Sequence, residues 1–268
     1  MRCLNENNKR EYYYMLKIGL TIAFSIGLAA CSGGDGTKNG EPLLTYGNEA
    51  PTLQAQAEQL DLVIFGGTAG VGLQTVKLAL DRGHKVTSIS RRPERMTLEH
   101  ENLDNLKGDI IKLESYSSFI KGKDAVISAI GVDSSSEKIT IYSEGVKNIL
   151  NAIGPDSSTQ VITITGIGAG DSKGHGGFFY DRIINPLMLK EDYADKTRQE
   201  ALLRSSQSKW TIVRPGFLID DASETRYRVL LDMDNVLSGD IARADVAHFL
   251  VAVVEQGAYI NDTVFLSN

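Results

Sequence analysis

The stretch LDLVIFGGTAGVGLQTVKLAL, residues 60–80, decides the fold of this chain. A short apolar run leads into a glycine-rich turn at 66–72. The turn continues into a helical pattern with Leu73, Val76 and Leu80 on one face. An apolar run of this length that ends in glycines is typical of a buried parallel strand. The stretch therefore predicts a strand that turns directly into a helix.

The chain repeats this alternation as far as residue 268. Helices are predicted at 70–80, 141–153, 192–206 and 242–254, and strands at 60–66, 85–90, 106–111, 125–130, 160–165, 210–214 and 263–266. On helix 192–206, we expect Lys196, Glu200 and Arg204 on the exposed face because they follow at four-residue spacing. Such alternation produces right-handed βαβ units and a parallel sheet covered on both sides. We therefore expect residues 60–268 to form a single α/β domain, a Rossmann-type doubly wound parallel sheet.

Composition excludes several classes of function. The net charge is −6, so a broad phosphate-binding surface is not expected and nucleic acid is not a predicted partner. The two cysteines, Cys3 and Cys31, and four scattered histidines exclude a cysteine-based zinc or iron–sulfur site, and no metal is expected. Hydrophobic residues make up 42% of the chain, which argues against wholesale disorder. Composition leaves the oligomeric state open.

Residues 1–30 are predicted to be a lipoprotein signal peptide. The uncharged run IGLTIAFSIGLAA, residues 18–30, follows Lys17 and is shorter than the roughly 20 residues that span a bilayer. The run leads into Cys31 and Ser32, and this junction resembles a bacterial lipobox, whose cysteine is lipidated and becomes the mature N-terminus. Because the polar segment before it is unusually long, Met15 is an alternative start.

Residues 31–59 are rich in Gly, Asn, Thr and Glu, and we expect them to form a flexible tether. The domain is then predicted to belong to the cell envelope, with the membrane as a partner through the lipid on Cys31. Ser32 after the cysteine indicates the outer membrane, where the host has one. A cytoplasmic protein is the alternative if the N-terminal run is not a signal peptide.

The glycine-rich turn predicts a dinucleotide-binding loop. Glycines permit a sharp bend and let backbone N–H groups approach a pyrophosphate at the N-terminus of the following helix. The alternative is a tight turn without a ligand. The spacing of the glycines is G-x-x-x-G-x-G rather than G-x-G-x-x-G. The candidate cofactor contacts in this turn are Gly66, Thr68, Ala69, Gly70, Val71 and Gly72.

The second predicted strand ends in Ser90-Arg91-Arg92-Pro93. An acidic residue at this point would accept hydrogen bonds from the adenosine ribose of NAD, and the sequence has none there. Two guanidinium groups suit the 2′-phosphate of NADP. We therefore predict that Arg91 and Arg92 favour NADP(H) over NAD(H), with a solvated basic loop as the alternative.

Eight segments carry a family resemblance: VIFGGTAGVG, SRRP, KGDI, DAVISAIG, ITGIGAGDSKGHGG, DKTRQEALLRSS, WTIVRPG and ARADVAHFL. Together they resemble the atypical short-chain dehydrogenase/reductase group, namely the NmrA-like and the biliverdin-reductase-B and flavin-reductase-like NAD(P)H-binding proteins. The resemblance covers about residues 60–268 and implies NADP(H) bound at the carboxyl ends of the strands. Further contacts are expected there, with strand-end packing as the alternative: Asp109, Ile110, Ala129, Ile130, Gly131, Thr165, Gly166 and Pro215.

The catalytic motif of that superfamily is incomplete in this chain. Its usual acid is a Tyr four residues before a Lys that lowers the phenol pKa and holds the nicotinamide ribose. Here Tyr193 stands three residues before Lys196, and Asp192 stands four before it. Because both spacings share a helix face, Tyr193 remains a candidate acid and Lys196 a candidate ribose contact. The alternatives are a packing or substrate-wall role for Tyr193 and a surface salt bridge for Lys196.

The loop at 167–180 carries five glycines together with His175, Phe178, Phe179 and Tyr180. Loops at this edge of such a sheet hold substrates, so His175 or Tyr180 is a candidate proton donor. The alternative for His175 is a solvated loop histidine. Flavin-reductase-like proteins pass hydride to a ring system that takes its proton from water. The broken tyrosine motif therefore does not exclude reductase activity.

These observations favour an NADP(H)-dependent oxidoreductase that transfers hydride to a small organic acceptor, a flavin, quinone or carbonyl. The alternative is a non-catalytic NADP(H)-binding protein that senses redox state or interacts with a partner. The broken tyrosine motif favours that alternative. A nucleotide-sugar epimerase or dehydratase needs the tyrosine and lysine at full spacing and is disfavoured.

Overall fold

The computed structural model describes residues 47–55, 58–132, 138–155, 157–177, 189–223, 225–233 and 237–268. The predicted signal peptide, Cys31, and the loop residues Phe178, Phe179 and Tyr180 lie outside this set. Within the described ranges, no helix is long and apolar enough to cross a membrane.

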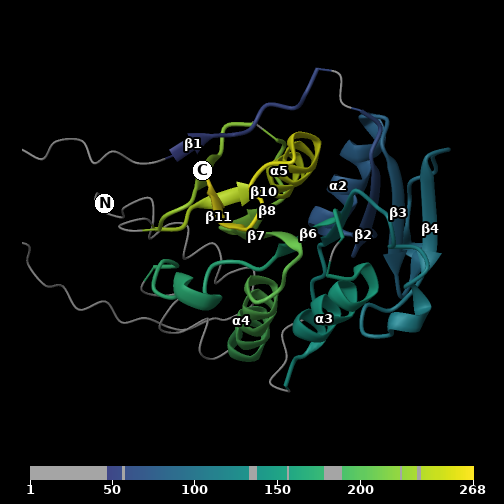
Figure 1. The fold of residues 1–268 in the computed structure, drawn as a ribbon. Coiled ribbons are helices and arrows are strands. Elements are labelled where there is room, and N and C mark those ends of the chain that lie inside the picture. The colour runs from purple at the N-terminus through teal and green to yellow at the C-terminus, as the bar shows by residue number, and fades with distance from the viewer. Residues whose placement is uncertain are drawn as a thin grey trace, which may run out of the picture. The chain divides into compact units, whose positions relative to one another are not determined.

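A nine-stranded sheet forms the centre of the described domain (Figure 1). The parallel strands follow the order β4-β3-β2-β5-β6-β7-β11. They are β2 (Asp61–Phe65), β3 (Lys85–Ser90), β4 (Leu103–Lys107), β5 (Ala125–Ser128), β6 (Gln160–Ile164), β7 (Lys209–Pro215) and β11 (Asp262–Ser267). The chain leaves β2 toward β3 and later returns to β5 on its other side, so the strand order reverses there. The predicted doubly wound sheet is confirmed.

Four short strands were not predicted from the sequence. β9 (Arg228–Leu230) pairs antiparallel with β11, and β1 (Gly47–Glu49) pairs antiparallel with β9 at the edge. β8 (Phe217–Ile219) and β10 (Asp240–Ala242) form a separate parallel pair. Segments of three residues are too short to show a hydrophobic period.

Helices cover both faces of the sheet (Figure 1). α2 (Gly70–Asp81) and α5 (Arg243–Gln256) pack together on one face, and α3 (Ile141–Ile153) and α4 (Lys190–Arg204) on the other. Every residue of α5 from 246 to 254 is buried, because this helix packs against α2 and is also covered by the sheet and by the segment before β2. Burial on both sides removes the amphipathic alternation that a surface helix shows.

Loops replace helices on either side of β4. One-turn 3-10 helices, Pro93–Arg95 and Leu113–Ser115, interrupt these connections. The third strand was predicted at 106–111, a few residues beyond β4. Ile110 caused this error, because its side chain packs into the core on the α3 face rather than continuing a strand. A Cβ on Gly145 of α3 would lie 2.8 Å from Ile110 Cδ1.

Glu200 of α4 is not on an exposed face, and that prediction was wrong. Its side chain is fully buried, and Arg214 of β7 donates to both carboxylate oxygens, at 2.9 and 2.6 Å. The Thr165 hydroxyl donates to the same carboxylate at 2.9 Å. Spacing within one helix cannot reveal a partner that arrives from a strand.

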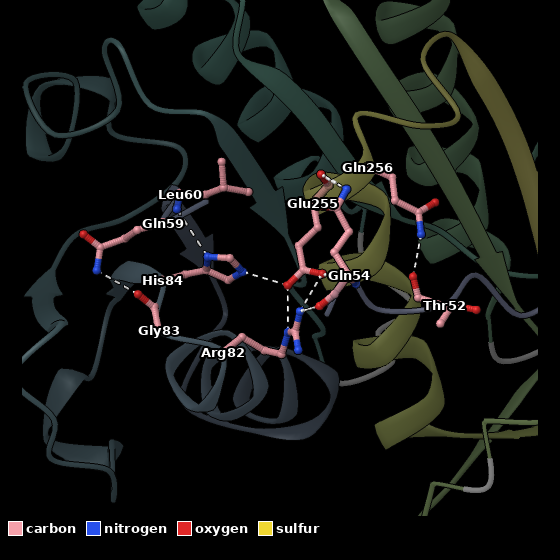
Figure 2. A network of polar contacts seen from close by, with 9 residues as sticks. All are labelled: Thr52, Gln54, Gln59, Leu60, Arg82, Gly83, His84, Glu255 and Gln256. Carbon is pink, nitrogen blue, oxygen red and sulfur yellow. Dashed lines mark hydrogen bonds and ion pairs between the residues drawn. The ribbon is translucent and has the colours of Figure 1, made fainter. Parts of the chain in front are cut away.

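The segment before β2 is held against the domain by a network around Glu255 of α5 (Figure 2). Glu255 accepts from Arg82 Nε at 2.8 Å and lies 3.0 Å from His84 Nε2. His84 Nδ1 accepts the backbone N–H of Leu60 at 3.2 Å. Gln54 bonds to the carboxylate through its N–H and to the Glu255 carbonyl through its side chain. Residues 47–55, part of the expected tether, therefore contact the domain.

Glu255 stabilises the fold as a carboxylate. Burial opposes its ionisation, but hydrogen bonds from Arg82 and His84 outweigh that effect and hold its pKa below the ordinary value of 4.5. A lowered pKa means that the stabilisation is present above the pKa of the unfolded chain. It is lost as the pH falls through the pKa of the folded state.

We expect Glu255→Gln to lower the free energy of unfolding at neutral pH by about 3 kcal/mol, because it removes a buried carboxylate that binds both Arg82 and the buried His84. The difference from the wild type should shrink at acidic pH, as Glu255 itself becomes protonated, because its pKa is lowered from the ordinary value. Chemical denaturation at both pH values measures this. The control is Glu144→Gln, which removes the exposed pair with Lys147 and should change stability by less than about 1 kcal/mol. A Glu255→Gln chain as stable as the wild type at neutral pH would contradict this account.

Candidate functional site

The glycine turn brings three elements together at the carboxyl edge of the sheet. Gly66 has φ +82°, and a Cβ there would lie 2.6 Å from the carbonyl oxygen of Ala129 at the end of β5. A Cβ on Gly72 would lie 2.2 Å from the carbonyl oxygen of Gly66. No side chain fits at either position, so glycine allows β2, β5 and α2 to approach closely. This contact lies where the strand order reverses, which is where open α/β sheets bind ligands.

The N-terminus of α2 is suited to an anion. Among the described residues, no side chain caps Ala69, and the first turn of the helix holds no acidic residue. Ala69 and Gly70 are exposed. The first N–H groups of a helix lack intrahelical partners and carry partial positive charge, so they attract phosphate groups. Residues 66–72 thus fit the pyrophosphate of a dinucleotide.

The end of β3 supplies polar groups beside this turn. Arg91 and Arg92 follow the strand directly and are exposed. A Cβ on Gly67 would lie 2.5 Å from Ser88 Oγ, so Ser88 lies beneath the turn. Within the described part of the chain, the hydroxyls of Ser88 and Ser90 are buried without a hydrogen-bond partner. Buried polar atoms usually have a hydrogen-bond partner, so Ser90 is a further candidate cofactor contact.

A cation that the sequence analysis missed lies over the turn. Arg243, the first residue of α5, has its Nε 3.9 Å from where a Gly70 Cβ would be. Its Nη1 donates to Asp220 Oδ1 at 2.7 Å. The segment ARADVAHFL contains Arg243, but linear spacing does not show that it faces the glycine turn.

Gly166 and Tyr193 meet where β6 ends. Gly166 has φ +131°, and a Cβ there would lie 3.2 Å from the Tyr193 hydroxyl oxygen. Tyr193 also packs against a small apolar cluster of Ile167, Leu230 and Phe265. Its hydroxyl therefore lies at the carboxyl edge, where the nicotinamide was expected.

Lys196 is held by a carboxylate and two aromatic rings. Its Nζ lies 2.9 Å from Asp192 Oδ2 and about 5 Å from the ring centroids of Tyr142 and Tyr193, at 5.0 and 4.9 Å. The Tyr142 hydroxyl donates to Asp192 Oδ1 at 2.8 Å and accepts the N–H of Val132. Burial, and then the Asp192 carboxylate, raise the pKa of Tyr142 far above its ordinary value, so it remains a neutral phenol.

Asp195 fixes α4 against α3 and so holds this cluster in place. One carboxylate oxygen accepts the N–H groups of Tyr142 at 2.9 Å and Ser143 at 3.3 Å. The other accepts the Ser143 hydroxyl and Arg198 Nε. The carboxylate therefore caps the N-terminus of α3 from a neighbouring helix, which propensities within α3 could not indicate.

The other predicted contacts divide into two groups. The backbone of Ala129 bonds to β2 through its N–H, and Ile130, Gly131 and Pro215 follow or end strands at the same edge. Three residues instead form internal contacts. Asp109 accepts the N–H of Ile111, the Ile110 side chain lies in the core, and Thr165 bonds to Glu200.

His175 lines a pocket of ≈ 250 Å³, and among the described residues neither Tyr193 nor Lys196 belongs to its lining. Its carbonyl accepts the N–H of Ser238 at 2.8 Å. The pocket is lined by Asp171, His175, Arg214, Leu230, Leu231, Asp232, Met233, Thr263 and Phe265. Burial opposes ionisation of Asp171, but hydrogen bonding to Arg214 outweighs it and lowers the Asp171 pKa.

A model of the NAD(P)H-binding family matches residues 66–257 of this chain, which include the turn, the end of β3 and Arg243. The chain belongs to the NAD(P)H-binding family. The match begins at Gly66, where the glycine turn begins, and ends one residue after α5. The predicted nicotinamide cofactor is thereby supported, because the residues of the turn fit its pyrophosphate.

Solved structures with the same fold cover most of this chain. ChuY of Escherichia coli O157:H7, an anaerobillin reductase, is 21% identical with a TM-score of 0.66, over 77% of this chain and 96% of that one. A short-chain dehydrogenase/reductase of Veillonella parvula DSM 2008 is 13% identical with a TM-score of 0.65, over 79% and 95%. The oxidoreductase ylbE of Lactococcus lactis is 19% identical with a TM-score of 0.64, over 78% and 91%.

The uncharacterised oxidoreductase C162.03 of Schizosaccharomyces pombe is 35% identical over 60 residues. The match covers 22% of this chain and spans only 20% of that protein's length. The similarity to this oxidoreductase is therefore limited to a short segment.

We expect Gly66→Ala to lower the free energy of unfolding of this protein more than Gly83→Ala does. Both glycines have nearly the same φ, +82° and +84°, so both variants bear the strain of left-handed alanine, about 1–2 kcal/mol. Only Gly66 has backbone within reach of a Cβ, which adds about 1–3 kcal/mol of overpacking. Denaturant titration measures the free energy of unfolding of the two variants, and the difference between them gives the contribution of the close contact at Gly66. Equal losses of stability would show that β2 and β5 can move apart without cost.

Proposed function

We propose that this protein is an NADP(H)-dependent oxidoreductase that passes hydride to a flavin or quinone, without a tyrosine acid. The observation that carries this proposal is the ion pair of 2.9 Å between Lys196 and Asp192, at the position where a catalytic tyrosine would stand. A ring acceptor that delocalises the incoming charge can take its proton from water. A simple carbonyl needs a positioned acid, which contributes roughly 10²–10⁴-fold in rate.

The environment of Lys196 supports a hydride transfer in which no side chain of this cluster protonates the substrate. Asp192 already neutralises its charge, and the two tyrosine rings face the ammonium group. The Tyr142 phenol is 3% exposed and donates a hydrogen bond to Asp192, so it is not presented to a substrate. Binding the nicotinamide ribose remains compatible with Lys196, which has three donors.

The preference for NADP(H) rests on Arg91 and Arg92. Both are exposed at the end of β3, where no carboxylate is available for the ribose hydroxyls of NAD. Guanidinium groups bind phosphate in bidentate fashion, so two of them suit a 2′-phosphate.

We also propose that the chain is anchored to the cell envelope through a lipid on Cys31. The basis is the uncharged run at 18–30 that ends at this cysteine. The intact mass of the protein extracted from membranes tests the anchor. A mature chain that begins at Cys31 with an added lipid supports it, and an unprocessed, unmodified chain contradicts it.

A non-catalytic NADP(H) sensor is the second candidate. The same Asp192–Lys196 pair favours it, because a binding protein has no need of a proton donor. Binding of NADPH without turnover of any flavin or quinone would favour the sensor.

We expect Tyr193→Phe to change the rate of NADPH oxidation with a flavin or quinone by less than about twofold, since no tyrosine proton is needed. Absorbance of NADPH during turnover measures this, and the fluorescence of bound NADPH checks that the variant still binds cofactor. A fall of about 10²-fold or more at unchanged affinity would identify Tyr193 as the acid and overturn the proposed mechanism.

For the double variant Arg91→Ala, Arg92→Ala, we expect NADPH affinity to fall by about tenfold or more while NADH affinity stays within about twofold. Calorimetric titration of the full chain in detergent measures both. An equal effect on the two cofactors would remove the basis for the NADP preference.

A further inference from the structure

Arg243 lies beside the glycine turn although it is more distant in the sequence than the other candidate cofactor contacts. It begins α5, and α5 packs against α2 (Figure 1). Both helices run antiparallel to the strands beside them, so both N-termini lie at the carboxyl edge of the sheet. The Arg243 side chain then reaches Gly70, with Nε and Cδ 3.9 and 4.0 Å from where a Gly70 Cβ would be.

The present partner of Arg243 is a weak competitor. Arg243 pairs with Asp220 at 2.7 Å, but the Asp220 side chain is 84% exposed and the Arg243 side chain 29%. Ion pairs as exposed as this contribute little. A pyrophosphate at the turn would offer the guanidinium two negative charges and leave the Asp220 carboxylate free to return to water.

The positive charge of the turn itself is smaller than the negative charge of a pyrophosphate. Helix N–H groups supply only about half an elementary charge, and the described first turn of α2 has no basic side chain of its own. Arg91 and Arg92 follow β3 and are assigned to the 2′-phosphate. A further positive charge at the turn would strengthen pyrophosphate binding, and Arg243 is placed to supply it.

We propose that Arg243 is a phosphate-binding residue whose guanidinium clamps the cofactor pyrophosphate against the N-terminus of α2. This inference rests on the proposed dinucleotide function and adds a residue from α5 to it. It separates two basic sites. Arg243 serves the pyrophosphate that NAD and NADP share, and the arginines after β3 serve the 2′-phosphate that only NADP has.

Calorimetric titration of the full chain with NADP⁺, NAD⁺ and adenosine 2′-monophosphate tests this separation. For Arg243→Gln we expect both dinucleotides to bind about tenfold more weakly or worse, as loss of a charge-assisted hydrogen bond predicts. The 2′-monophosphate, which lacks the pyrophosphate, should bind within about twofold of the wild type, which also shows that the variant is folded. The double variant of Arg91 and Arg92 should weaken NADP⁺ and the 2′-monophosphate by about tenfold or more and leave NAD⁺ within about twofold of the wild type.

Two controls isolate the role of Arg243. Lys147→Gln removes one positive charge from the exposed face of α3 and should leave all three affinities within about twofold. Asp220→Asn breaks the same ion pair but keeps Arg243, and should not weaken dinucleotide binding.

Three results would overturn the clamp. Unchanged dinucleotide affinity in Arg243→Gln removes it while leaving the proposed function intact. Equal losses in Arg243→Gln and Asp220→Asn show that the ion pair acts on the fold rather than on the ligand. Failure of the wild type to bind either dinucleotide overturns both the clamp and the proposed function.

Discussion

The structure depends on the close approach of backbone at the glycine turn. Gly66 and Gly72 let β2, β5 and α2 meet at distances that any Cβ would prevent. The contact fixes where the strand order reverses and aims the uncapped N-terminus of α2 at the carboxyl edge. Every other group assigned to the site, from the end of β3 to Arg243 and Tyr193, derives its role from its position relative to that edge.

Ion pairing then separates structural charges from functional ones. Glu200 with Arg214 is a buried pair, and the buried Glu255 carboxylate holds the half-buried Arg82, so both pairs hold elements together. A buried cation with a satisfied carboxylate is unavailable to a ligand, because removing its partner is costly. Arg91, Arg92 and Arg243 are more exposed or only weakly paired, and they surround the turn. The distribution of partners thus indicates which cations a phosphate can recruit, although the net charge of the chain is negative.

The sequence was most informative where structure is local. Residues 141–153 were predicted as a helix and α3 has those bounds, because its apolar residues repeat at helical spacing. The glycine turn was also predictable, because the conformations that its glycines allow are a local property of the sequence. The predicted bounds of β4 were a few residues too late. An edge strand is half exposed and shows a weak apolar pattern, and Ile110, which lies beyond β4, belongs to the core. Arg243 over Gly70, and Tyr142 with Asp192, join residues far apart in the chain, and no spacing rule reports such contacts.

The measurement that tests the central claim most directly is hydrogen–deuterium exchange at the amides of residues 66–75, with and without NADP⁺. If the N–H groups of the turn and of the first part of α2 hold the pyrophosphate, saturating cofactor should slow their exchange more than it slows exchange in α3. Saturable binding that leaves these amides unprotected would contradict the account. It would place the dinucleotide elsewhere on the domain.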